Sequence, residues 1–503
     1  MPNLRSTHLF ICSRLREESG IALVLALAIT AALTVSATAA VTFTASSARS
    51  SDRSKADQTA LALAEAGLSN ATAVLGNPSN NALQAATLPS SEATASSVQY
   101  EAGTAKWWGS LNPATQTWSL VGKGIVRSAD PNAPSVTRTV GESIDVLANL
   151  TQPLNNQAWN YLMARRTGDP DHCDQELRQS VTVRAPLYVS GNLCMFNTAS
   201  VMPGVGPPSP APAVNLVVAG SASFANTSHV GESDSKIASA YIANGCNGHV
   251  PCSFNSADPV WATASGQVPP AITAPTVDWD YWYANASPGP RHPCAVTAGT
   301  PPILDNNAFR DSPNGSVPVF DLTPVDADYT CRNVSGGGAV IGELSWNHTT
   351  KVLTVRGAIF IDGSVLVSQG PVNYNGQASL YLSGTFTMGT TTQLCGGVVA
   401  GHCDFGAWNP NTELLLVIAN GDDGSRVSAA LNQSSDFQGG IYATNDVVIG
   451  QSANLEGPLL GGSLILNNTV DAKPFPVIDT VPIGTPGNPN VYAQPQQPRN
   501  FSG

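Results

Sequence analysis

The chain has 503 residues, a formal net charge of −12 and only 12% charged residues. One compact core seldom holds a chain of that length, so we expect two or more domains. The acidic balance and the scattered basic residues argue against nucleic-acid binding through a basic surface.

The N-terminal region predicts a membrane-spanning helix. An uncharged run from Ile21 to Phe43 follows Ser19-Gly20, and Arg14 and Arg16 precede it. A helix rises about 1.5 Å per residue, so this run can cross a hydrocarbon core of roughly 30 Å. The positive charge before the run places the N-terminus in the cytoplasm and the body of the chain outside, as a single-pass protein of the cell membrane.

The same helix is expected to continue into an amphipathic stalk. Apolar residues recur there every three to four positions, which makes one apolar stripe: Ala56, Ala60, Leu63, Ala64, Leu68, Ala71 and Leu75. Gly76-Asn77-Pro78 then supplies a stop, because Pro cannot continue the helix. The predicted helix covers residues 21–76.

A basic leader ending in Gly20, an apolar helix and the segment Ala64–Leu68 (Ala-Glu-Ala-Gly-Leu) resemble type IV pilin-related proteins. The resemblance is closest to PilX-type minor pilins, also called pilus assembly proteins, and it covers the N-terminal part only. It implies that residues 1–20 are a leader that a prepilin peptidase cuts after Gly20, which leaves Ile21 as the new terminus.

Residue 25 departs from the major-pilin pattern. Major pilins carry Glu at the fifth mature position, where this chain has Leu25. That Glu is thought to pair with the N-terminus of a neighbouring subunit, so Leu25 points away from a major, filament-forming subunit. We expect the helix to pack against other pilin subunits through Leu25, Ala60, Leu63 and Leu68.

Two other interpretations of the apolar run stay open. It can be a plain single-pass anchor, or a secretory signal peptide cut near Ala37–Ala39. The run is longer than a usual signal-peptide core, and helical patterning continues beyond that point, which favours the pilin-like interpretation.

The cysteines predict disulfides in an oxidising compartment. Cys12 lies in the leader, and the other eight form an even set beyond the membrane helix. Eight cysteines allow 105 pairings, and sequence neighbours favour Cys173–Cys194, Cys246–Cys252, Cys294–Cys331 and Cys395–Cys403. A zinc site at His172-Cys173 or His402-Cys403 lacks the paired CxxC spacing of structural zinc, so we expect neither a metal nor a cofactor.

The body is predicted to be β-rich, which gives an α+β fold overall. Strand patterns at 118–127 and 135–147 flank a turn-rich loop, so residues 77–150 are expected to form a small antiparallel β-meander. Residues 151–480 contain short apolar strands separated by Gly corners. This pattern favours a parallel β-solenoid, most clearly over about 340–470, and a β-sandwich or jelly roll fits nearly as well.

Three segments interrupt or end this pattern. Residues 203–213 form a proline-rich loop that cannot join a ladder. Residues 255–330, with an aromatic cluster at 279–283, are expected to form a disulfide-fixed cap or a long loop. Residues 481–503 are rich in Pro, Asn and Gln, which predicts an extended or disordered tail.

Few residues suggest catalysis. Asp278 and Asp280 flank Trp279, and paired acids beside aromatic residues recur in glycan-cleaving sites, but capping and turn formation explain such a segment more simply. The segment 420–425 is rich in oxygen ligands and could hold Ca²⁺, although it lacks EF-hand spacing. The chain contains neither a Gly-x-Ser-x-Gly elbow nor a His-Glu-x-x-His motif.

We therefore expect a non-enzymatic minor pilin or pilus assembly protein with a large extracellular head for assembly, adhesion or surface recognition. The expected partners are other pilin subunits, the membrane assembly platform, membrane lipid and the prepilin peptidase, with surface glycans as a further candidate. The alternative is a membrane-tethered protein that binds or cleaves polysaccharide along a β-helix groove.

Overall fold

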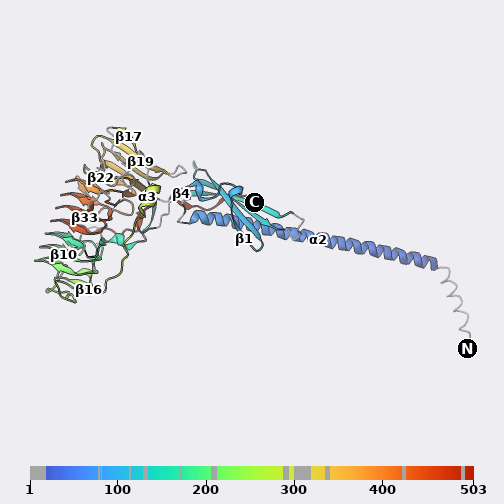
Figure 1. The fold of residues 1–503 in the computed structure, drawn as a ribbon, viewed down its shortest axis with the longest axis horizontal. Coiled ribbons are helices and arrows are strands. Elements are labelled where there is room, and N and C mark those ends of the chain that lie inside the picture. The colour runs from blue at the N-terminus through green and yellow to red at the C-terminus, as the bar shows by residue number, and fades with distance from the viewer. Residues whose placement is uncertain are drawn as a thin grey trace, which may run out of the picture.

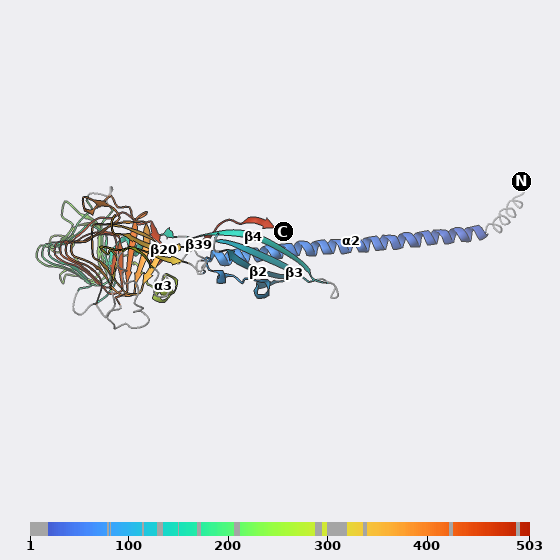
Figure 2. The ribbon, with the colours of Figure 1, turned by 90° about the horizontal axis from the view of Figure 1, so that it is seen from above.

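The computed structural model shows a long helix, a small sheet and a large β-solenoid in succession along one axis (Figures 1 and 2). It describes residues 19–77, 80, 82–112, 115–127, 134–148, 150–168, 173–205, 212–286, 294–298, 319–334, 340–421, 426–488 and 493–502. A long N-terminal helix followed by a strand-rich body confirms the predicted α+β fold class, and the parallel strands of the body confirm its solenoid character.

The helix α2 (Ser19–Gly76) contains 58 residues. At 1.5 Å per residue it is about 87 Å long. Its N-terminal half projects away from the rest of the molecule, and its C-terminal half lies against a β-sheet (Figure 1). The change occurs where the sequence passes from an uncharged run to an amphipathic stripe.

The sheet beside the helix is an antiparallel meander in the order β1-β2-β3-β4. Its strands are β1 (Ser96–Tyr100), β2 (Gly103–Asn112), β3 (Thr117–Val126) and β4 (Val136–Ala148), and the 3-10 turns η1 (Ala85–Thr87) and η2 (Glu92–Thr94) precede them. Trp118 is fully buried and donates its indole N–H to the carbonyl oxygen of Ala82 over 2.7 Å. This bond ties the segment after the helix to the sheet.

Close packing of the helix on the meander requires glycine at two positions of β3. A Cβ atom at Gly122 or Gly124 would overlap the backbone carbonyl oxygen of Ala64 or Ala60, respectively. Without a Cβ, the strand backbone approaches the helix backbone directly. The Gly-Lys-Gly segment within β3 therefore serves helix packing.

The body is a three-faced solenoid in which each full turn, or rung, supplies one strand to each face. The strands nearer the N-terminus are β6 (Leu162–Ala164), β7 (Gln175–Leu177), β8 (Thr182–Val183), β9 (Leu187–Val189), β10 (Leu193–Met195), β11 (Ser200–Val201), β12 (Asn215–Val218), β13 (Ala222–Phe224), β14 (His229–Val230), β15 (Ile237–Ile242) and β16 (Ala262–Gly266). The later strands are β18 (Val319–Asp321), β21 (Val352–Ile361), β22 (Ser364–Val367), β23 (Val372–Asn375), β24 (Gln377–Leu382), β25 (Phe386–Met388), β26 (Gln393–Cys395), β29 (Leu414–Ala419), β30 (Val427–Leu431), β31 (Asp436–Gln438), β32 (Gly440–Ala443), β33 (Asp446–Ile449), β34 (Asn454–Glu456), β35 (Leu459–Gly461), β36 (Leu464–Leu466) and β37 (Asp471–Ala472).

The rungs do not stack in chain order. The first rung (β6, β7, β8) pairs in parallel with the last rung (β35, β36, β37). From this seam the earlier strands extend to one end of the solenoid at β16, and the later strands extend to the other end. Figure 1 shows the seam as the place where red strands lie beside green-blue ones.

One aliphatic stack runs through both halves and across the seam. Its members are register partners in successive rungs: Leu216, Leu187, Leu162, Leu459, Ile441, Val417, Leu380 and Ile359. All of them are buried. The two halves therefore share a single core, and each rung covers the apolar face of the next.

Arginines of the first rung also cross the seam. Arg166 lies 2.8 Å from the carboxylate of Asp446, and Arg184 donates to Asp471 over 2.7 Å. Arg178 donates to the side chain of Asn467 over 2.8 Å, and Arg165 lies over the ring of Tyr442. Asp446 is buried and is also paired with Arg426 within its own half, so its charge is compensated from both sides of the seam.

The end of the solenoid nearest the meander is closed by antiparallel strands. These are β17 (Cys294–Ala298), β19 (Asp328–Val334) and β20 (Val340–Asn347), which pair in that order and continue into β21. Helix α3 (Trp279–Ala286) packs beside them, and the ring of Trp282 stacks on Tyr381. Part of the predicted insertion at 255–330 therefore forms this cap, while residues 287–293 and 299–318 lie outside the described residues, as do 206–211 of the proline-rich loop.

The chain enters and leaves the solenoid side by side. Strand β5 (Thr151–Pro153) pairs antiparallel with β38 (Thr480–Pro482), close to the 3-10 turn η3 (Gln157–Asn160). Beyond it, β39 (Ala493–Pro495) and β40 (Arg499–Ser502) pair with β4 of the meander. The solenoid is thus inserted between two strands of one sheet.

The sequence predicted an extended or disordered tail at 481–503, and the structure shows extended strands at 493–495 and 499–502 within this tail. Its neutral, Pro-rich composition cannot form a core of its own, but the tail completes a sheet that already exists. Strand β4 offers backbone donors and acceptors along its open edge, and Arg499 adds an ion pair with Asp145 at 2.8 Å. Order comes here from a partner that lies more than 340 residues earlier in the chain.

We predict that Gly124→Val destabilises the helix–meander contact by at least about 2 kcal/mol, because the added side chain has no space against the Ala60 carbonyl. Thermal unfolding of the full-length variant measures the loss. Gly397→Val in a distant loop is a matched control, since its new Cβ would meet its nearest atom at 3.8 Å. Equal melting temperatures for wild type and Gly124→Val would contradict the packing described here.

We also predict that Asp446→Ala loosens both sides of the seam. The change leaves Arg166 and Arg426 without their carboxylate and should cost on the order of 2–4 kcal/mol. Hydrogen exchange should accelerate in both β6–β8 and β33–β37. Asp280→Ala, in the distant helix α3, is the control. Faster exchange on one side alone would show that the halves do not support each other.

Candidate functional site

The N-terminal half of α2 is an uncovered apolar rod (Figure 2). From Leu23 the helix is long and apolar enough to span a membrane. Its large apolar side chains are each more than half exposed: Leu23, Val24, Leu25, Leu27, Ile29, Leu33, Val35, Val41 and Phe43. Exposing apolar area to water costs about 25 cal/mol per Å², so an apolar surrounding would stabilise this surface.

The hydroxyl groups in this rod bond to the helix itself. Thr30 donates to the carbonyl oxygen of Ala26 over 2.8 Å, and Thr42 donates to that of Thr38 over the same distance. Ser36 and Thr44 likewise donate to carbonyl oxygens four residues earlier. Since each of these hydroxyls has a partner within the helix, they can enter an apolar environment at little cost.

The C-terminal half of α2 is covered by the protein's own meander. Ala60, Leu63 and Leu68 are buried there, which corrects the expectation that they pack against other subunits. The spacing of the stripe correctly indicates a buried helix face, but the strands that cover this face are β2, β3 and β4 of the same chain. Leu25 is 60% exposed and is the one member of that predicted set with a free surface.

A charged pair fixes the helix to the meander near the start of this contact. Arg138 of β4 donates to both carboxylate oxygens of Asp57, one of them over 2.8 Å. The hydrogen bond from Arg138 lowers the pKa of Asp57. The pair is exposed and contributes orientation more than stability.

The predicted processing site lies at the start of the described chain. Gly20 and Ile21 belong to the first turn of α2. The basic leader, with Cys12, Arg14 and Arg16, lies outside the described residues. Cleavage itself therefore stays a prediction.

Seven cysteines within the described residues occur in disulfides. The structure contains Cys173–Cys194, Cys246–Cys252 and Cys395–Cys403. Cys331 is also disulfide-bonded and lies directly opposite Cys294 in the β17–β19 register. Cys395–Cys403 closes a short loop that contains the hairpin β27 (Val398–Val399) and β28 (His402–Cys403), so Cys403 cannot serve as a zinc ligand.

The paired aspartates lie at the start of α3. The side chain of Asp278 accepts a hydrogen bond of 3.0 Å from the backbone N–H of Tyr281, which is the geometry of a helix N-cap. This favours the capping interpretation of Asp278, while Asp280 lies exposed in the first turn. Residues 422–425 of the possible Ca²⁺ loop lie outside the described residues. Within the described residues, no group of three His, Cys, Asp or Glu side chains is placed to hold a metal ion.

A buried acid was not singled out from the sequence. Glu456 is fully buried beside the segment that follows the Cys395–Cys403 loop, where it accepts hydrogen bonds from Gln438 over 2.8 Å and from the backbone N–H of Gly406 over 3.0 Å. Burial raises its pKa to about 7, against the opposing effect of those hydrogen bonds. Because the carboxyl group has no solvent access, it cannot reach a substrate and acts on the stability of the solenoid instead.

No protein-family model matches the chain, and no curated protein matches it either. Among solved structures, the chain is similar to the competence-associated pilin ComZ from Thermus thermophilus, with 12% identity and a TM-score of 0.37. The alignment covers 82% of this chain and 87% of that one. Since this similarity is low, the function has to be inferred from the residues of the chain itself.

We predict that Glu456 makes stability depend on pH. Below about pH 4.5 the carboxyl group is protonated in both the folded and the unfolded chain, so it has no effect. Between about 4.5 and 7 only the unfolded chain releases the proton, so stability falls as pH rises, by a total on the order of 3 kcal/mol. Glu456→Gln should remove this loss.

Thermal unfolding of wild type and Glu456→Gln from pH 4.5 to pH 8 measures the effect. The melting temperatures should diverge as pH rises, with the variant higher. Glu101→Gln, in an exposed turn of the meander, is the control and should follow wild type. A constant difference between wild type and Glu456→Gln over the whole range would contradict the raised pKa.

Proposed function

We propose that this protein is a type IV pilus-related minor subunit or assembly protein of PilX type, anchored in the cell membrane with its body outside. The observation that carries the proposal is the contrast along α2. Its C-terminal half is covered by the chain's own meander, whereas its N-terminal half is apolar and uncovered. A helix of this kind is suited to lie first in lipid and then among the helices of other subunits.

Assembly would use the exposed rod. After removal of residues 1–20 by a prepilin peptidase, Ile21 would become the terminus and the helix could move from the bilayer into a bundle of pilin helices. In such a bundle, Leu25 would present an uncharged side chain to the neighbouring helices. A neutral residue at that position cannot form an ion pair with the terminal amine of a neighbour. This supports the role of a minor or initiating subunit over that of a major, filament-forming subunit.

The solenoid would then be the exposed head. It joins the meander through two connections, β4 to β5 and β38 to β39, and the two strands β5 and β38 pair with each other. Force on the helix would thereby be shared between one covalent path, through β4 and β5, and a second path through the hydrogen bonds that hold β39 and β40 on β4. This double connection suits a domain that adheres to or recognises a surface while the stalk is pulled.

The proposal includes no enzymatic activity. The aspartate pair that suggested glycan cleavage includes a helix cap, and the one strongly perturbed carboxylic acid among the described residues, Glu456, is buried away from solvent. Catalysis would need an accessible acid and base within reach of one bond.

We predict that the mature protein begins at Ile21 in both membrane and sheared surface fractions, as determined by N-terminal sequencing. Gly20→Val should retain the leader and abolish recovery in the sheared fraction. Gly397→Val is a matched control, because its new Cβ would meet its nearest atom at 3.8 Å in a distant loop. A start at Ala40 would indicate secretion, and an intact leader would indicate a plain anchor; either result would contradict the proposal.

A further inference from the structure

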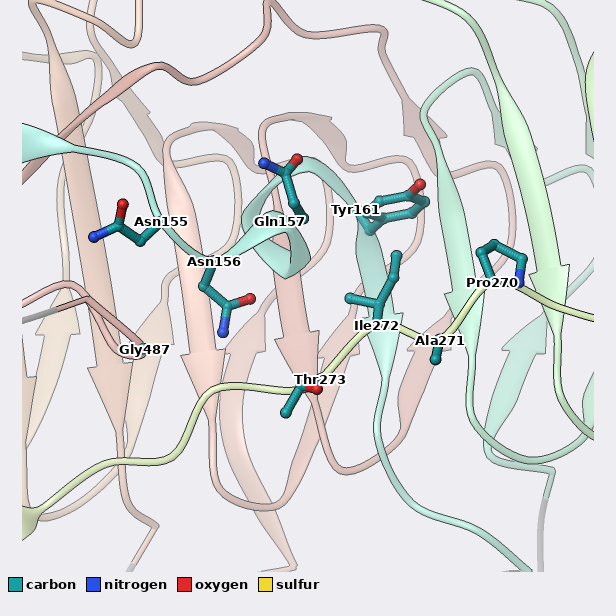
Figure 3. Close-up of a pocket in the computed structure, with 9 residues that line it drawn as sticks. All are labelled: Asn155, Asn156, Gln157, Tyr161, Pro270, Ala271, Ile272, Thr273 and Gly487. Atoms are coloured by element: carbon teal, nitrogen blue, oxygen red, sulfur yellow. The ribbon is translucent and has the colours of Figure 1, made fainter.

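A pocket of about 450 Å³ lies on the solenoid where three distant parts of the chain meet (Figure 3). One wall comes from the segment that enters the solenoid, one from the strap at 267–278 that follows β16, and one from the segment that leaves the solenoid. The lining residues are Asn155, Asn156, Gln157, Tyr161, Pro270, Ala271, Ile272, Thr273 and Gly487. The volume is within the range of small-molecule pockets.

Hydrogen bonds fix the incoming and outgoing walls to each other. Asn488 accepts from the backbone N–H of Asn155 over 3.0 Å and donates to the carbonyl oxygen of Pro153 over 2.8 Å. The buried Trp159 donates its indole N–H to the carbonyl oxygen of Pro486 over 2.9 Å. This part of the pocket is therefore formed before any ligand arrives, which lowers the entropic cost of binding.

Gly487 lies at a place in the pocket wall that has no room for a side chain. It adopts a φ of +82°, and a Cβ there would lie 2.6 Å from the side-chain nitrogen of Asn156 and 2.9 Å from Pro275 of the strap. A larger residue would be strained and would displace both walls. The side-chain oxygen of Asn156 accepts from the backbone N–H of Ala158 over 2.9 Å, which fixes the orientation of the amide.

The strap forms the third wall of the pocket, and it is held in place without pairing to a β-strand. Its prolines lack backbone donors and favour an extended chain. The hydroxyl of Tyr442 donates to the carbonyl oxygen of Pro275 over 3.3 Å, which anchors the strap to the solenoid. In Figure 3 the side chain of Ile272 is directed from the strap toward Tyr161.

Tyr161 supplies an aromatic surface. Its ring packs edge-on against Tyr188, with 6.2 Å between the ring centroids, and the side chain stays partly exposed. Burial raises the pKa of its hydroxyl, so the group remains a neutral donor at physiological pH. A fixed ring beside hydrogen-bonding groups suits a ligand that has both apolar C–H faces and hydroxyls.

The chemistry of the lining is neutral throughout. The side chains of Asn155, Gln157 and Thr273 offer amide and hydroxyl groups, and none of the nine lining residues carries a charge. A phosphate, a uronate or a nucleic acid would meet no cation among these nine lining residues. We propose that this pocket binds a neutral carbohydrate, with Tyr161 against the sugar ring and Asn155, Gln157 and Thr273 bonded to its hydroxyls.

This inference deepens the recognition step of the proposed function and rests on it. Its test is nevertheless separate: binding is measured on purified full-length protein, whereas assembly is read from the mature N-terminus. A chain that starts at Ile21 but does not bind sugar would retain the proposed function and lose only this inference.

The experiment is calorimetric titration of the full-length protein in a zwitterionic detergent without sugar groups. The probes are neutral trisaccharides of glucose, galactose and N-acetylglucosamine, with a galacturonate trisaccharide and a single-stranded oligonucleotide as charged comparisons. We expect at least one neutral trisaccharide to bind with a Kd of about 1 mM or lower, and the charged probes not to bind at the pocket.

Variants locate the site. Tyr161→Ala should weaken binding about tenfold, Gln157→Ala about threefold to tenfold, and Tyr161→Phe less than Tyr161→Ala because the ring remains. Gln451→Ala, at an exposed turn of the solenoid away from the pocket, is the matched control. If Tyr161→Ala lowers the melting temperature, its loss of binding could reflect unfolding. Sugar binding by Gln157→Ala and Thr273→Val then decides the result.

The inference is overturned if none of the three neutral trisaccharides binds with a Kd of about 1 mM or lower. It is also overturned if folded pocket variants bind as well as wild type, or if a charged probe binds more tightly and loses affinity in the same variants.

Discussion

The parallel pairing of β6 with β35 is the constraint on which the rest of the body depends. A solenoid that stacked in chain order would have its first and last rungs at opposite ends. Here Leu162 and Leu459 are register partners, so the chain starts and finishes at the middle of the stack. Both connections to the meander must therefore leave from one place. That is why β5 and β38 can pair, and why the last residues can reach β4.

The same constraint places the pocket. The incoming segment at 155–161 and the outgoing segment at 486–488 adjoin because the seam brings the two chain ends together. The strap crosses this place because the chain has to travel from β16 at one end of the solenoid to the cap at the other. Three segments separated by more than 100 residues thus meet at the part of the head that is joined to the stalk.

The sequence predicted local features well and long-range pairing poorly. The uncharged run at 21–43, the meander strands and the Gly corners of the solenoid follow from local rules. The seam does not, because the short apolar strand at Leu162–Ala164 has the same pattern as the strands with which it could pair. The stripe containing Ala60 and Leu68 predicted burial but not its partner, since a helix face looks the same whether its own chain or another subunit covers it. The candidate pocket was missed for a similar reason, because Tyr161, Thr273 and Gly487 are unremarkable until the fold brings them together.

The two halves of α2 have different surroundings: the C-terminal half packs on the meander, and the N-terminal half is exposed. Gly122 and Gly124 let the meander approach so closely that it buries the stripe containing Ala60, Leu63 and Leu68, and leaves Leu61, at 38% exposure, as the large apolar side chain of the C-terminal half that is exposed. Most of the exposed apolar surface of α2 therefore lies on the N-terminal half, whose Thr30 and Thr42 hydroxyls have partners within the helix. The meander is held firmly by its own helix, and the N-terminal half of the helix remains uncovered. A helix whose apolar face was exposed along its whole length would not be fixed to its own meander in this way.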